Sequence, residues 1–344
     1  MTQVSFADDR GMTLIRAVRA LVISQGSMTD GADFARSAWG NATQVADVLE
    51  QRLLDTGRVD DPAGPARALG RFIVELVLRR SALGRLDALR QFFRAPVSAP
   101  VLGITQHVIA TWTGEGHAYE VSDMAFAVRR LAARKLGVIL IYTLEFLRLM
   151  DPNVDGAIRR DIVRAMSAAL DSALLSPDNL GIDGIQPANV YGTNITAGSG
   201  NAAWDLGNAL AGLSDGQIAD CVLVLNPADV AAAIEQGLSD AGSLNIDGGY
   251  LCGYPAICST AIPRSAVAWI VPPEILLTDA GLIIEHATQA TFEAIDPDTH
   301  ESTIHSLWVE NLASLRATYF INWQATTDNA AGLITDCINA AGTK

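Results

Sequence analysis

The sequence predicts an α+β fold with more than one domain, and three observations lead to this prediction. Residues 11–55 space their apolar side chains as helices do, and residues 96–143 are rich in β-branched and aromatic side chains. A long amphipathic helix then follows Asp151. The chain has 344 residues, enough for two domains of about 100–200 residues each.

The N-terminal part is expected to be helical. Apolar side chains recur at helical spacing over 14–22 and again over 45–53, and the polar segment 27–31 separates the two runs. A linker rich in Asp, Pro and Gly at 60–65 precedes a third helical stretch, about 66–78.

The next part predicts a protruding hairpin. Two extended arms, Val101–Trp112 and Tyr119–Leu131, flank the turn Thr113–Gly116. Glu115 stands at this turn between two glycines, where a carboxylate is either solvated or a contact to another subunit. The apolar run Val138–Tyr142 predicts a buried strand.

The clearest helix starts after Asp151, with Pro152 at its first helical position, and stops before Pro177. Its length is expected to be roughly 30–35 Å at 1.5 Å per residue. The predicted apolar stripe consists of Ile158, Ile162, Met166, Ala169 and Ala173, with Val163, Leu170 and Leu174 beside it.

The C-terminal part is expected to mix helices and strands. A helix at Trp204–Leu213 is followed by a buried strand at Cys221–Leu225 and by a helix that begins at Asn226-Pro227 and ends at Gly237. Two strands, about Leu282–Ile295 and Thr303–Trp323, enclose a turn formed by Asp296, Pro297, Asp298 and Thr299.

The composition predicts surplus apolar surface. Apolar residues make up 49% and charged residues only 18%, against about 25% in ordinary soluble proteins. Subunit contacts are the natural place to bury such a surplus. A membrane is not expected, because the apolar run Leu136–Leu144 has nine residues and a spanning helix needs about 18. The N-terminus also lacks the features of a signal peptide, so we expect a soluble protein made in a cytoplasm.

Charge is unevenly distributed along the chain. Residues 1–170 carry 21 Lys and Arg against 18 Asp and Glu, a balance of +3. Residues 171–344 carry 3 against 20, a balance of −17, so the two parts sum to −14. No basic stripe of the kind that reads a DNA sequence is present, and the acidic part predicts a solvated, self-repelling face.

Two motifs suggest bound groups, but both have simpler interpretations. His300 and His305 are five residues apart in a strand-like stretch, which is not the i, i+4 helical spacing of a zinc pair. The run Gly248–Gly253 lacks the Gly-Lys-Ser/Thr ending of a phosphate loop and predicts close backbone approach in a turn. We therefore expect neither a metal nor a cofactor.

No catalytic residues are expected either. Ser259, Asp279 and His286 have the types of a nucleophilic triad, but no serine of the chain lies in a nucleophile-elbow pattern. The four cysteines are too few and too scattered for a disulfide framework and are predicted to be buried, reduced thiols. The sequence thus predicts a protein that is not an enzyme.

Several motifs stand in a fixed order between Trp112 and Asn322, and together they resemble a known family. They are Trp112–Gly116 with Val121, Ser122 and Phe126; Lys135–Ile139 with Thr143–Leu147; Asp161–Leu175; Asn226-Pro227 with Gly253–Ser259; and Trp308–Trp323. They resemble parts of the major capsid proteins with the Hong Kong 97 phage fold. In chain order, these parts are the extended loop, the strand and turn before the long spine helix, the spine helix itself, the axial domain, and the closing strands.

The resemblance implies an anatomy. Its parts are an N-terminal helical arm at 1–95, an extended loop region at 96–135, a peripheral domain with the spine helix at 136–185 and 282–323, and an axial domain at 186–281 and 324–344. The subunit-interface candidates are Trp112, Glu115, Phe126, Arg129, Arg130, Asp296 and Asp298.

The resemblance also implies a function. The chain is expected to be the major capsid protein of a tailed phage, forming pentamers and hexamers of an icosahedral shell around double-stranded DNA, without sequence-specific contact. Such shells assemble in the cytoplasm of the bacterial host and become part of the virion. Scaffolding, portal, protease and cement proteins are left open as partners. The alternative is the shell of an encapsulin nanocompartment, which shares the fold.

Some relatives link their subunits through a lysine on the extended loop. This chain has two lysines, Lys135 where the loop returns to the body and Lys344 at the end of the chain. Arginine stays protonated and cannot replace the lysine as a nucleophile. The resemblance therefore implies a shell without lysine cross-links.

Overall fold

The computed structural model describes most of the chain, and the described part forms two compact units. The described residues are 6–24, 27–40, 45–47, 49, 73–106, 111–115, 117–119, 121–123, 125–148, 152–239, 243–295 and 302–338. Unit 1 comprises Met1–Arg80, Leu136–Ser167 and Gly281–Tyr319. Unit 2 comprises Ser81–Lys135, Ala168–Ala280 and Phe320–Lys344. Among the described residues, no helix combines the length and the apolarity needed to cross a bilayer.

Two N-terminal helices of unit 1 pack through small side chains. These are α1 (Phe6–Ile23) and α2 (Met28–Trp39), and the Ser27 hydroxyl caps α2 by accepting a hydrogen bond from the Asp30 amide. Alanines let the two helices approach closely. Their buried contact consists of Ala17, Ala20, Leu21, Ala32 and Ala35, with Val45, Ala46 and Leu49. The predicted helical character of 11–55 is thus confirmed where residues are described.

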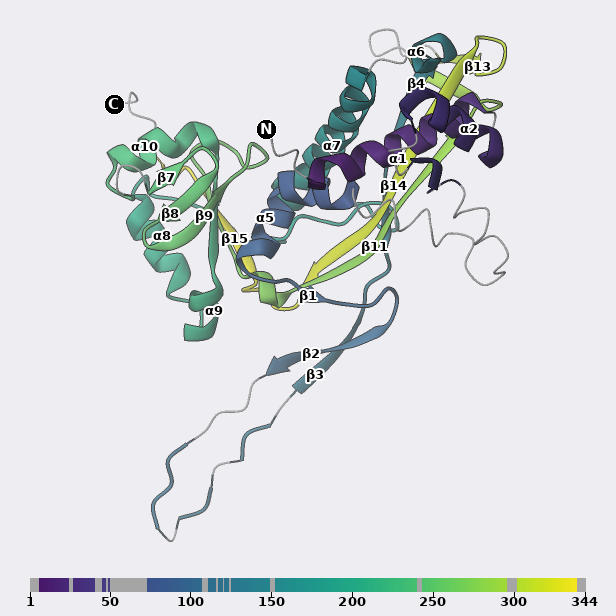
Figure 1. The fold of residues 1–344 in the computed structure, drawn as a ribbon. Coiled ribbons are helices and arrows are strands. Elements are labelled where there is room, and N and C mark those ends of the chain that lie inside the picture. The colour runs from purple at the N-terminus through teal and green to yellow at the C-terminus, as the bar shows by residue number, and fades with distance from the viewer. Residues whose placement is uncertain are drawn as a thin grey trace. The chain divides into compact units, whose positions relative to one another are not determined.

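A four-stranded sheet has the order β1-β11-β14-β4, and Figure 1 shows its long strands. Its strands are β1 (Phe93–Arg94), β11 (Ile275–Ala287), β14 (Leu312–Ala325) and β4 (Arg134–Thr143). The predicted strand at 138–142 lies in β4, but it is not buried. Its residues are half-buried or exposed, and Ile139 is 60% exposed, because β4 is an edge strand of this sheet.

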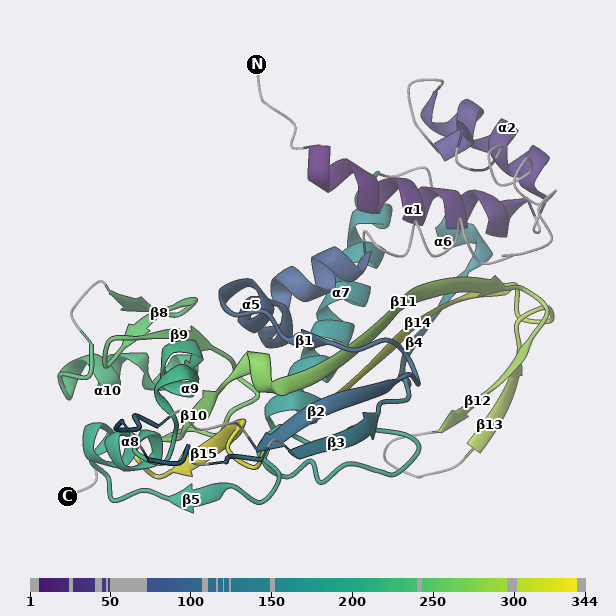
Figure 2. The same cartoon turned by 90° about the horizontal axis from the view of Figure 1, so that it is seen from below.

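The closing strands differ from the prediction. Each of the two predicted strands is broken into two shorter ones, so β12 (Thr291–Ile295) follows β11 and β13 (Ser302–Ser306) precedes β14. The strands β12 and β13 pair with each other as an antiparallel hairpin beyond the ends of β11 and β14 (Figure 2). The short helix α6 (Leu144–Arg148) follows β4. The predicted turn at 296–299 lies outside the described residues.

The long helix α7 (Pro152–Leu175) begins at Pro152, as predicted, and ends two residues before Pro177. Its 24 residues correspond to about 36 Å. The buried stripe follows a spacing of four residues throughout and consists of Ile158, Ile162, Met166, Leu170 and Leu174. The predicted end of the stripe was wrong, since Ala169 is exposed and Ala173 half-buried. The larger leucines fill the interior instead.

Unit 2 is built on a seven-stranded mixed sheet of order β5-β15-β10-β6-β9-β8-β7. Its strands are β5 (Ile195–Ala197), β6 (Val222–Leu225), β7 (Leu244–Asn245), β8 (Gly248–Leu251), β9 (Tyr254–Cys258), β10 (Val267–Ile270) and β15 (Ala331–Thr335). The central strands β6 and β10 are buried at every position, so both faces of the sheet are covered there.

Short helices supply much of that cover. They are α8 (Ala202–Leu210), α9 (Asp215–Asp220), α10 (Val230–Glu235) and the 3-10 turns η1 (Pro227–Asp229) and η2 (Pro272–Glu274). Leu206 and Leu210 of α8 share a buried cluster with Leu223 and Trp269 of the sheet. The predicted start at Asn226 is confirmed, because its side chain caps η1 by accepting a hydrogen bond from the Ala228 amide.

A two-stranded ribbon leaves the body of unit 2 (Figure 1). Antiparallel β2 (Pro100–Gln106) and β3 (Ala125–Arg130) pair from Pro100 opposite Arg130 to Gln106 opposite Ala125. This confirms the predicted hairpin, although the paired strands are shorter than the predicted arms. The helix α5 (Ala82–Leu89) precedes the ribbon, and its first amide, that of Ala82, donates to the Asp171 carboxylate at 2.7 Å.

Candidate subunit-contact surface

The glycine run at 248–253 holds strands together and opens onto no helix. Gly248 and Gly249 lie in β8 at φ +128° and +146°, values that favour glycine. A Cβ at Gly248 would lie 3.0 Å from the Ile257 Cα, and one at Gly249 would lie 3.0 Å from the Leu244 Cα. The prediction of close backbone approach is therefore confirmed, here within a strand.

His305 has a structural partner in unit 1. Its Nδ1 lies 2.9 Å from Glu310 Oε1, and its ring stacks on Phe292 with centroids 5.2 Å apart. His300 lies outside the described residues, so the predicted pair of histidines cannot be compared. Within the described ranges, no three His, Cys, Asp or Glu side chains form a group that could hold a metal ion.

The cysteines offer no activated thiol. Burial raises the pKa of Cys221 to about 12, and mainly burial raises those of Cys258 and Cys337 to about 11. These three thiols are buried and stay protonated at neutral pH. The prediction was wrong for Cys252, which is exposed because it stands at the turn between β8 and β9 with φ +51°.

The tip of the ribbon exposes large apolar side chains. Trp112 is fully exposed, Val121 is 90% exposed and Tyr119 is 82% exposed. Glu115 is exposed at a turn beside them. A soluble protein rarely leaves an indole entirely in water, so this tip has the composition of a contact surface in which aromatic side chains supply most of the binding energy.

Arg129 fixes the base of the ribbon to the body of unit 2. Its two terminal nitrogens donate to the carbonyls of Ala325, at 3.1 Å, and Thr326, at 2.7 Å. The planar guanidinium suits such a paired contact. The structure therefore gives this predicted interface residue a role within its own chain.

The same contact continues through Glu274. The Thr326 amide and hydroxyl both donate to the Glu274 carbonyl, at 2.8 and 2.6 Å. The Glu274 carboxylate accepts a hydrogen bond from Gln217 at 2.7 Å and another from Thr327. A chain of hydrogen bonds thus links the base of the ribbon to α9.

The other predicted interface residues have different surroundings. Arg130 is exposed on β3 and, among the described residues, has no acidic partner within 4.0 Å. Phe126 lies on β3 with its backbone opposite Ile104. Asp296 and Asp298 lie outside the described residues.

The prediction did not include the loop at 177–189, which two asparagines hold rigid. Asn179 Nδ2 donates to the Ala173 and Pro187 carbonyls at 2.6 and 2.9 Å, while its Oδ1 accepts from Gly181 and Gln186. Asn189 likewise donates to two carbonyls and accepts from two amides. Clustered Asn, Gly and Pro residues are the signal that could have predicted this loop.

Three aliphatic side chains of this rigid loop point into solvent. Leu180 is 82% exposed, Ile185 66% and Ile182 54%. A loop whose backbone and amide groups are so fully hydrogen-bonded loses little entropy when it binds, because it is already ordered. It is therefore a second candidate contact surface.

An open groove runs between this loop and the base of the ribbon, within unit 2. Its charged lining residues are Arg130, Arg134 and Asp183. The Trp323 indole closes one wall by donating to the Ala188 carbonyl at 2.8 Å. The rest of the lining includes both amide and apolar side chains, a mixture found where one protein binds another.

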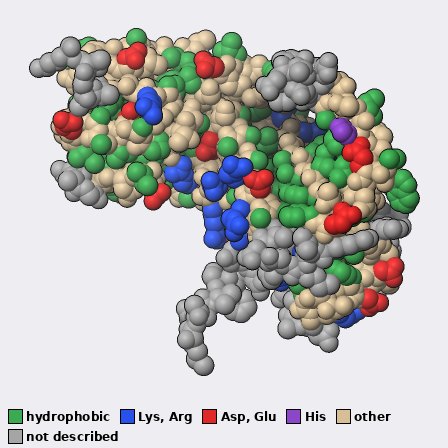
Figure 3. Space-filling view, turned by 90° about the horizontal axis from the view of Figure 1, so that it is seen from above, with side chains coloured by type: hydrophobic (Ala, Val, Ile, Leu, Met, Phe, Trp, Pro, Cys, Tyr) green, Lys and Arg blue, Asp and Glu red, His purple; other side chains and the backbone are tan. Residues whose placement is uncertain are grey.

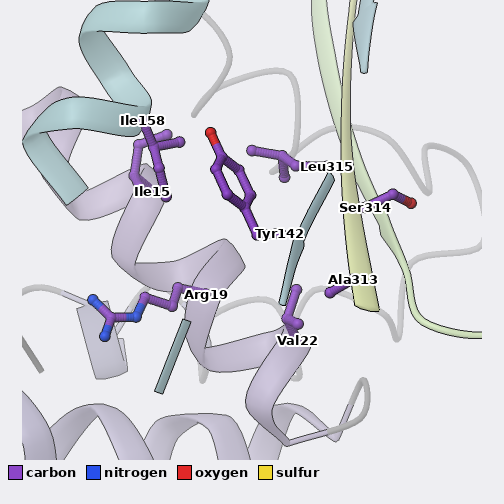
Figure 4. Close-up of a pocket in the computed structure, with 8 residues that line it drawn as sticks. All are labelled: Ile15, Arg19, Val22, Tyr142, Ile158, Ala313, Ser314 and Leu315. Carbon is purple, nitrogen blue, oxygen red and sulfur yellow. The ribbon is translucent and has the colours of Figure 1, made fainter. Parts of the chain in front are cut away.

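A cavity in unit 1 is too small for a ligand. It lies between α1, β4, α7 and β14, and Figure 4 shows Tyr142 pointing among Ile15, Ile158 and Leu315. Its volume of about 20 Å³ holds one water at most. Burial, with a smaller contribution from Asp161, raises the pKa of Tyr142, so this phenol stays neutral.

The charges of the surface follow the sequence. In Figure 3, several basic side chains form one larger group and others stand apart, while acidic side chains are scattered among apolar and neutral residues. Within residues 171–344 the only basic residues are Arg264, Arg316 and Lys344, and Arg316 already pairs with Glu285 at 2.6 Å. Most acids of this part therefore depend on solvent or ions for neutralisation.

A long helix, a protruding ribbon and two large sheets define the Hong Kong 97 fold of phage capsid proteins. A solved structure from Gordonia phage Cozz has a TM-score of 0.52 at 14% identity, covering 73% of this chain and 85% of that chain. One from Mycobacterium phage Adephagia has a TM-score of 0.51 at 17% identity, covering 74% and 90%.

The model of the phage capsid family matches residues 67–301, and the chain belongs to this family. The capsid polyprotein of Pseudomonas phage PAJU2 is 27% identical over 360 residues, covering 94% of this chain and 54% of the relative. The chain thus spans about half the length of this curated relative. The predicted family and fold are confirmed.

Proposed function

We propose that this chain is the major capsid protein of a tailed phage, which forms pentamers and hexamers and closes an icosahedral shell around double-stranded DNA. The exposed ribbon tip carries this proposal. Trp112, Tyr119 and Val121 bury little of their area in their own chain, whereas contacts between copies would remove them from water. Contacts that join two different surfaces of neighbouring copies can repeat around an axis and close into rings, and sets of such rings form shells.

We propose further that the contribution of the chain is structural and not catalytic. Ser259, the serine of the triad that the sequence argues against, is 4% exposed, and its hydroxyl accepts a hydrogen bond from the Ala261 amide. Asp279 and His286 lie seven residues apart on the same strand, β11. A buried serine without access to a substrate supports a non-enzymatic role.

The parts of the shell protein follow from the same proposal. Residues 136–185 and 282–323 would form the peripheral domain, and 186–281 with 324–344 the axial domain near the symmetry axes. Shell assembly would take place in the bacterial cytoplasm and end in the virion, with scaffolding, portal, protease and cement proteins as candidate partners. The packaged DNA would be held without sequence-specific contacts.

Sizing chromatography and negative-stain microscopy of freshly expressed protein test the proposal. We expect capsomers or closed particles whose amount rises with protein concentration. A compact monomer across a wide concentration range would refute shell assembly. Particles that co-purify with one protein cargo and exclude DNA would favour the encapsulin alternative.

A further inference from the structure

We propose that unit 2 contains a binding site for a neutral saccharide, in the open pocket between α8 and the strands β5, β10 and β15. Figure 2 shows α8 beside β5 and β15. The pocket has a volume of about 360 Å³, and small-molecule sites span about 300–1,000 Å³. Its lining residues all belong to unit 2, so the site is formed within one chain. The proposal goes beyond shell assembly, because it concerns a ligand and not a contact between copies.

One side of α8 forms a wall of the pocket. Trp204 and Asn208 both line it and lie four residues apart, which places them on the same side of the helix. The Asn201 side chain caps α8 by accepting a hydrogen bond from the Trp204 amide at 3.2 Å. The Asp205 carboxylate accepts hydrogen bonds from the Ser199 amide and hydroxyl, at 2.7 and 2.8 Å. These bonds fix the first turn of the helix, which carries Trp204, before any ligand binds.

Two tryptophans make the pocket aromatic. Trp204 is 62% exposed, whereas Trp269 is buried in β10 opposite Gly332 of β15. A Cβ at Gly332 would lie 2.7 Å from the Trp269 ring, so this glycine leaves room for the indole. The face of an indole is electron-rich and attracts the C–H groups on one side of a sugar ring. The exposed indole of Trp204 is therefore suited to stack on a saccharide.

Polar side chains with free hydrogen-bonding capacity surround the tryptophans. Thr196, Asn208 and Asn329 line the pocket, and no described residue is a hydrogen-bond partner of their side chains. Asn194 Nδ2 donates to the Ala331 carbonyl at 3.0 Å, which leaves its Oδ1 as an acceptor. Amide and hydroxyl groups both donate and accept, as the hydroxyl groups of a sugar do. These side chains can therefore bind sugar hydroxyls in either direction.

The charges of the pocket favour a neutral ligand. Among the described residues that line it, Asp205 is the only charged one, and both of its carboxylate oxygens accept hydrogen bonds from Ser199. The lining thus contains no cation that could balance a phosphate or a carboxylate. The whole lining also lies within residues 171–344, which carry −17. Nucleotides, nucleic acids and acidic peptides are therefore disfavoured.

A saccharide fits the pocket better than a neutral peptide does. A peptide that binds a sheet edge needs a row of open backbone groups and apolar holes for alternate side chains. The edge strand β5 has only three residues. The larger aliphatic residues of the lining, Leu213 and Ile334, are already buried in the core of unit 2. The accessible part of the lining therefore consists mainly of polar side chains and one indole.

Saturation-transfer NMR on the full-length chain tests the proposal. The probes are glucose, galactose, mannose and N-acetylglucosamine with their neutral trisaccharides, and glucuronate and a sulfated galactose as charged probes. At least one neutral probe should bind with a dissociation constant on the order of 1 mM, and the charged probes at least about tenfold more weakly. Capture of the chain by the same trisaccharides fixed to beads would identify a glycan anchored on a surface, and binding of the free sugar alone a soluble one.

Absence of binding by every neutral saccharide would overturn the proposal. Preference for the charged probes would overturn it too, as would binding of neutral peptides of similar size but of no saccharide. Because the pocket lies within one chain, each of these outcomes leaves shell assembly intact. A wild-type chain that binds a sugar but forms no particles would instead refute the proposed function alone.

Variants of the exposed tryptophan locate the site. Trp204→Ala should weaken binding about tenfold, whereas Trp204→Phe should lose less because an aromatic ring remains. Asn208→Asp should also weaken binding, because it loses the amide donor and adds a charge. Trp308→Ala is the matched control, since Trp308 is 66% exposed but lies in unit 1, and it should leave binding unchanged. Equal affinities of the wild-type and Trp204→Ala chains, with unfolding in urea unchanged, would overturn the assignment of the site.

Discussion

Replacing Gly249 with alanine should destabilise unit 2 more than any other glycine substitution considered below. Gly249 lies in β8 between β7 and β9, with its Cα opposite Leu244 and Ala256. A Cβ there would lie 2.9 Å from the Ser243 carbonyl carbon and still closer to its oxygen. The obstacle is backbone, which cannot turn aside as a side chain can.

Two costs add at this position. A φ of +146° belongs to a region that only glycine adopts readily, and holding alanine there costs about 1–3 kcal/mol. Moving β7 aside to relieve the overlap costs about 1–3 kcal/mol more. We therefore expect a loss of about 2–6 kcal/mol in the free energy of unfolding, a large fraction of the usual margin.

Two other glycines provide matched controls. Gly253 has φ +84° but no atom within 4 Å of the added Cβ, so its alanine variant should lose only about 1–2 kcal/mol. Gly207 lies exposed in α8 with open space around it, and alanine there should gain about 0.5–1 kcal/mol. Urea unfolding of the unassembled subunit, followed by fluorescence, measures all three. Equal stabilities for the Gly249 and Gly253 variants would refute the reasoning.

Three further outcomes are expected. Burial raises the pKa of Asp229 in the folded chain above the ordinary value of 3.8. The folded state therefore loses stability relative to the unfolded state as pH rises from about 3.8 through the raised pKa. Asp229→Asn should therefore be more stable than wild type at pH 7, with the difference vanishing at low pH; a difference independent of pH would contradict this. Particles boiled in detergent should give one band near 36.4 kDa, because Lys135 and Lys344 are the only lysines; a ladder that survives reductant would show cross-links. Assembly yield should change with salt or magnesium, because residues 171–344 carry −17 and screening acts over roughly 8–10 Å; a flat yield would exclude converging like charges.

The sequence predicted best those elements whose own residues determine them. The start of α7 follows from Pro152, and the buried strand at 222–225 follows from a run of aliphatic side chains. The hairpin follows from two β-rich arms around a glycine turn. In each case the local pattern and the burial found in the fold agree.

The errors arose where burial depends on neighbours distant in sequence. The apolar run at 138–142 reads as a central strand, but β4 is at the edge of its sheet. Cys252 follows a buried strand residue, yet the chain turns there and exposes it. No pattern within a few residues could reveal either fact.

The candidate surface was predicted only in part. Glu115 was predicted as a contact because it stands between two glycines on a protruding loop, and Trp112 because it belongs to the motif that resembles the extended loop of the family. The role of Arg129 at the base of the ribbon could not be predicted, because its acceptors are the carbonyls of Ala325 and Thr326, almost 200 residues away. The three aliphatic side chains of the loop 177–189 were missed for a similar reason, since their exposure depends on how two asparagines fold the loop.

The loop 177–189 depends on two asparagine side chains, so it is sensitive to their deamidation. The side-chain nitrogens of Asn179 and Asn189 each donate to two carbonyl oxygens. Deamidation would replace each nitrogen by an oxygen that cannot donate, and four carbonyls would then face a negative charge. Material aged in the warm should accordingly lose its loop structure in step with deamidation at these two positions, which peptide mass spectrometry can follow. The order of this loop thus depends on two amide groups.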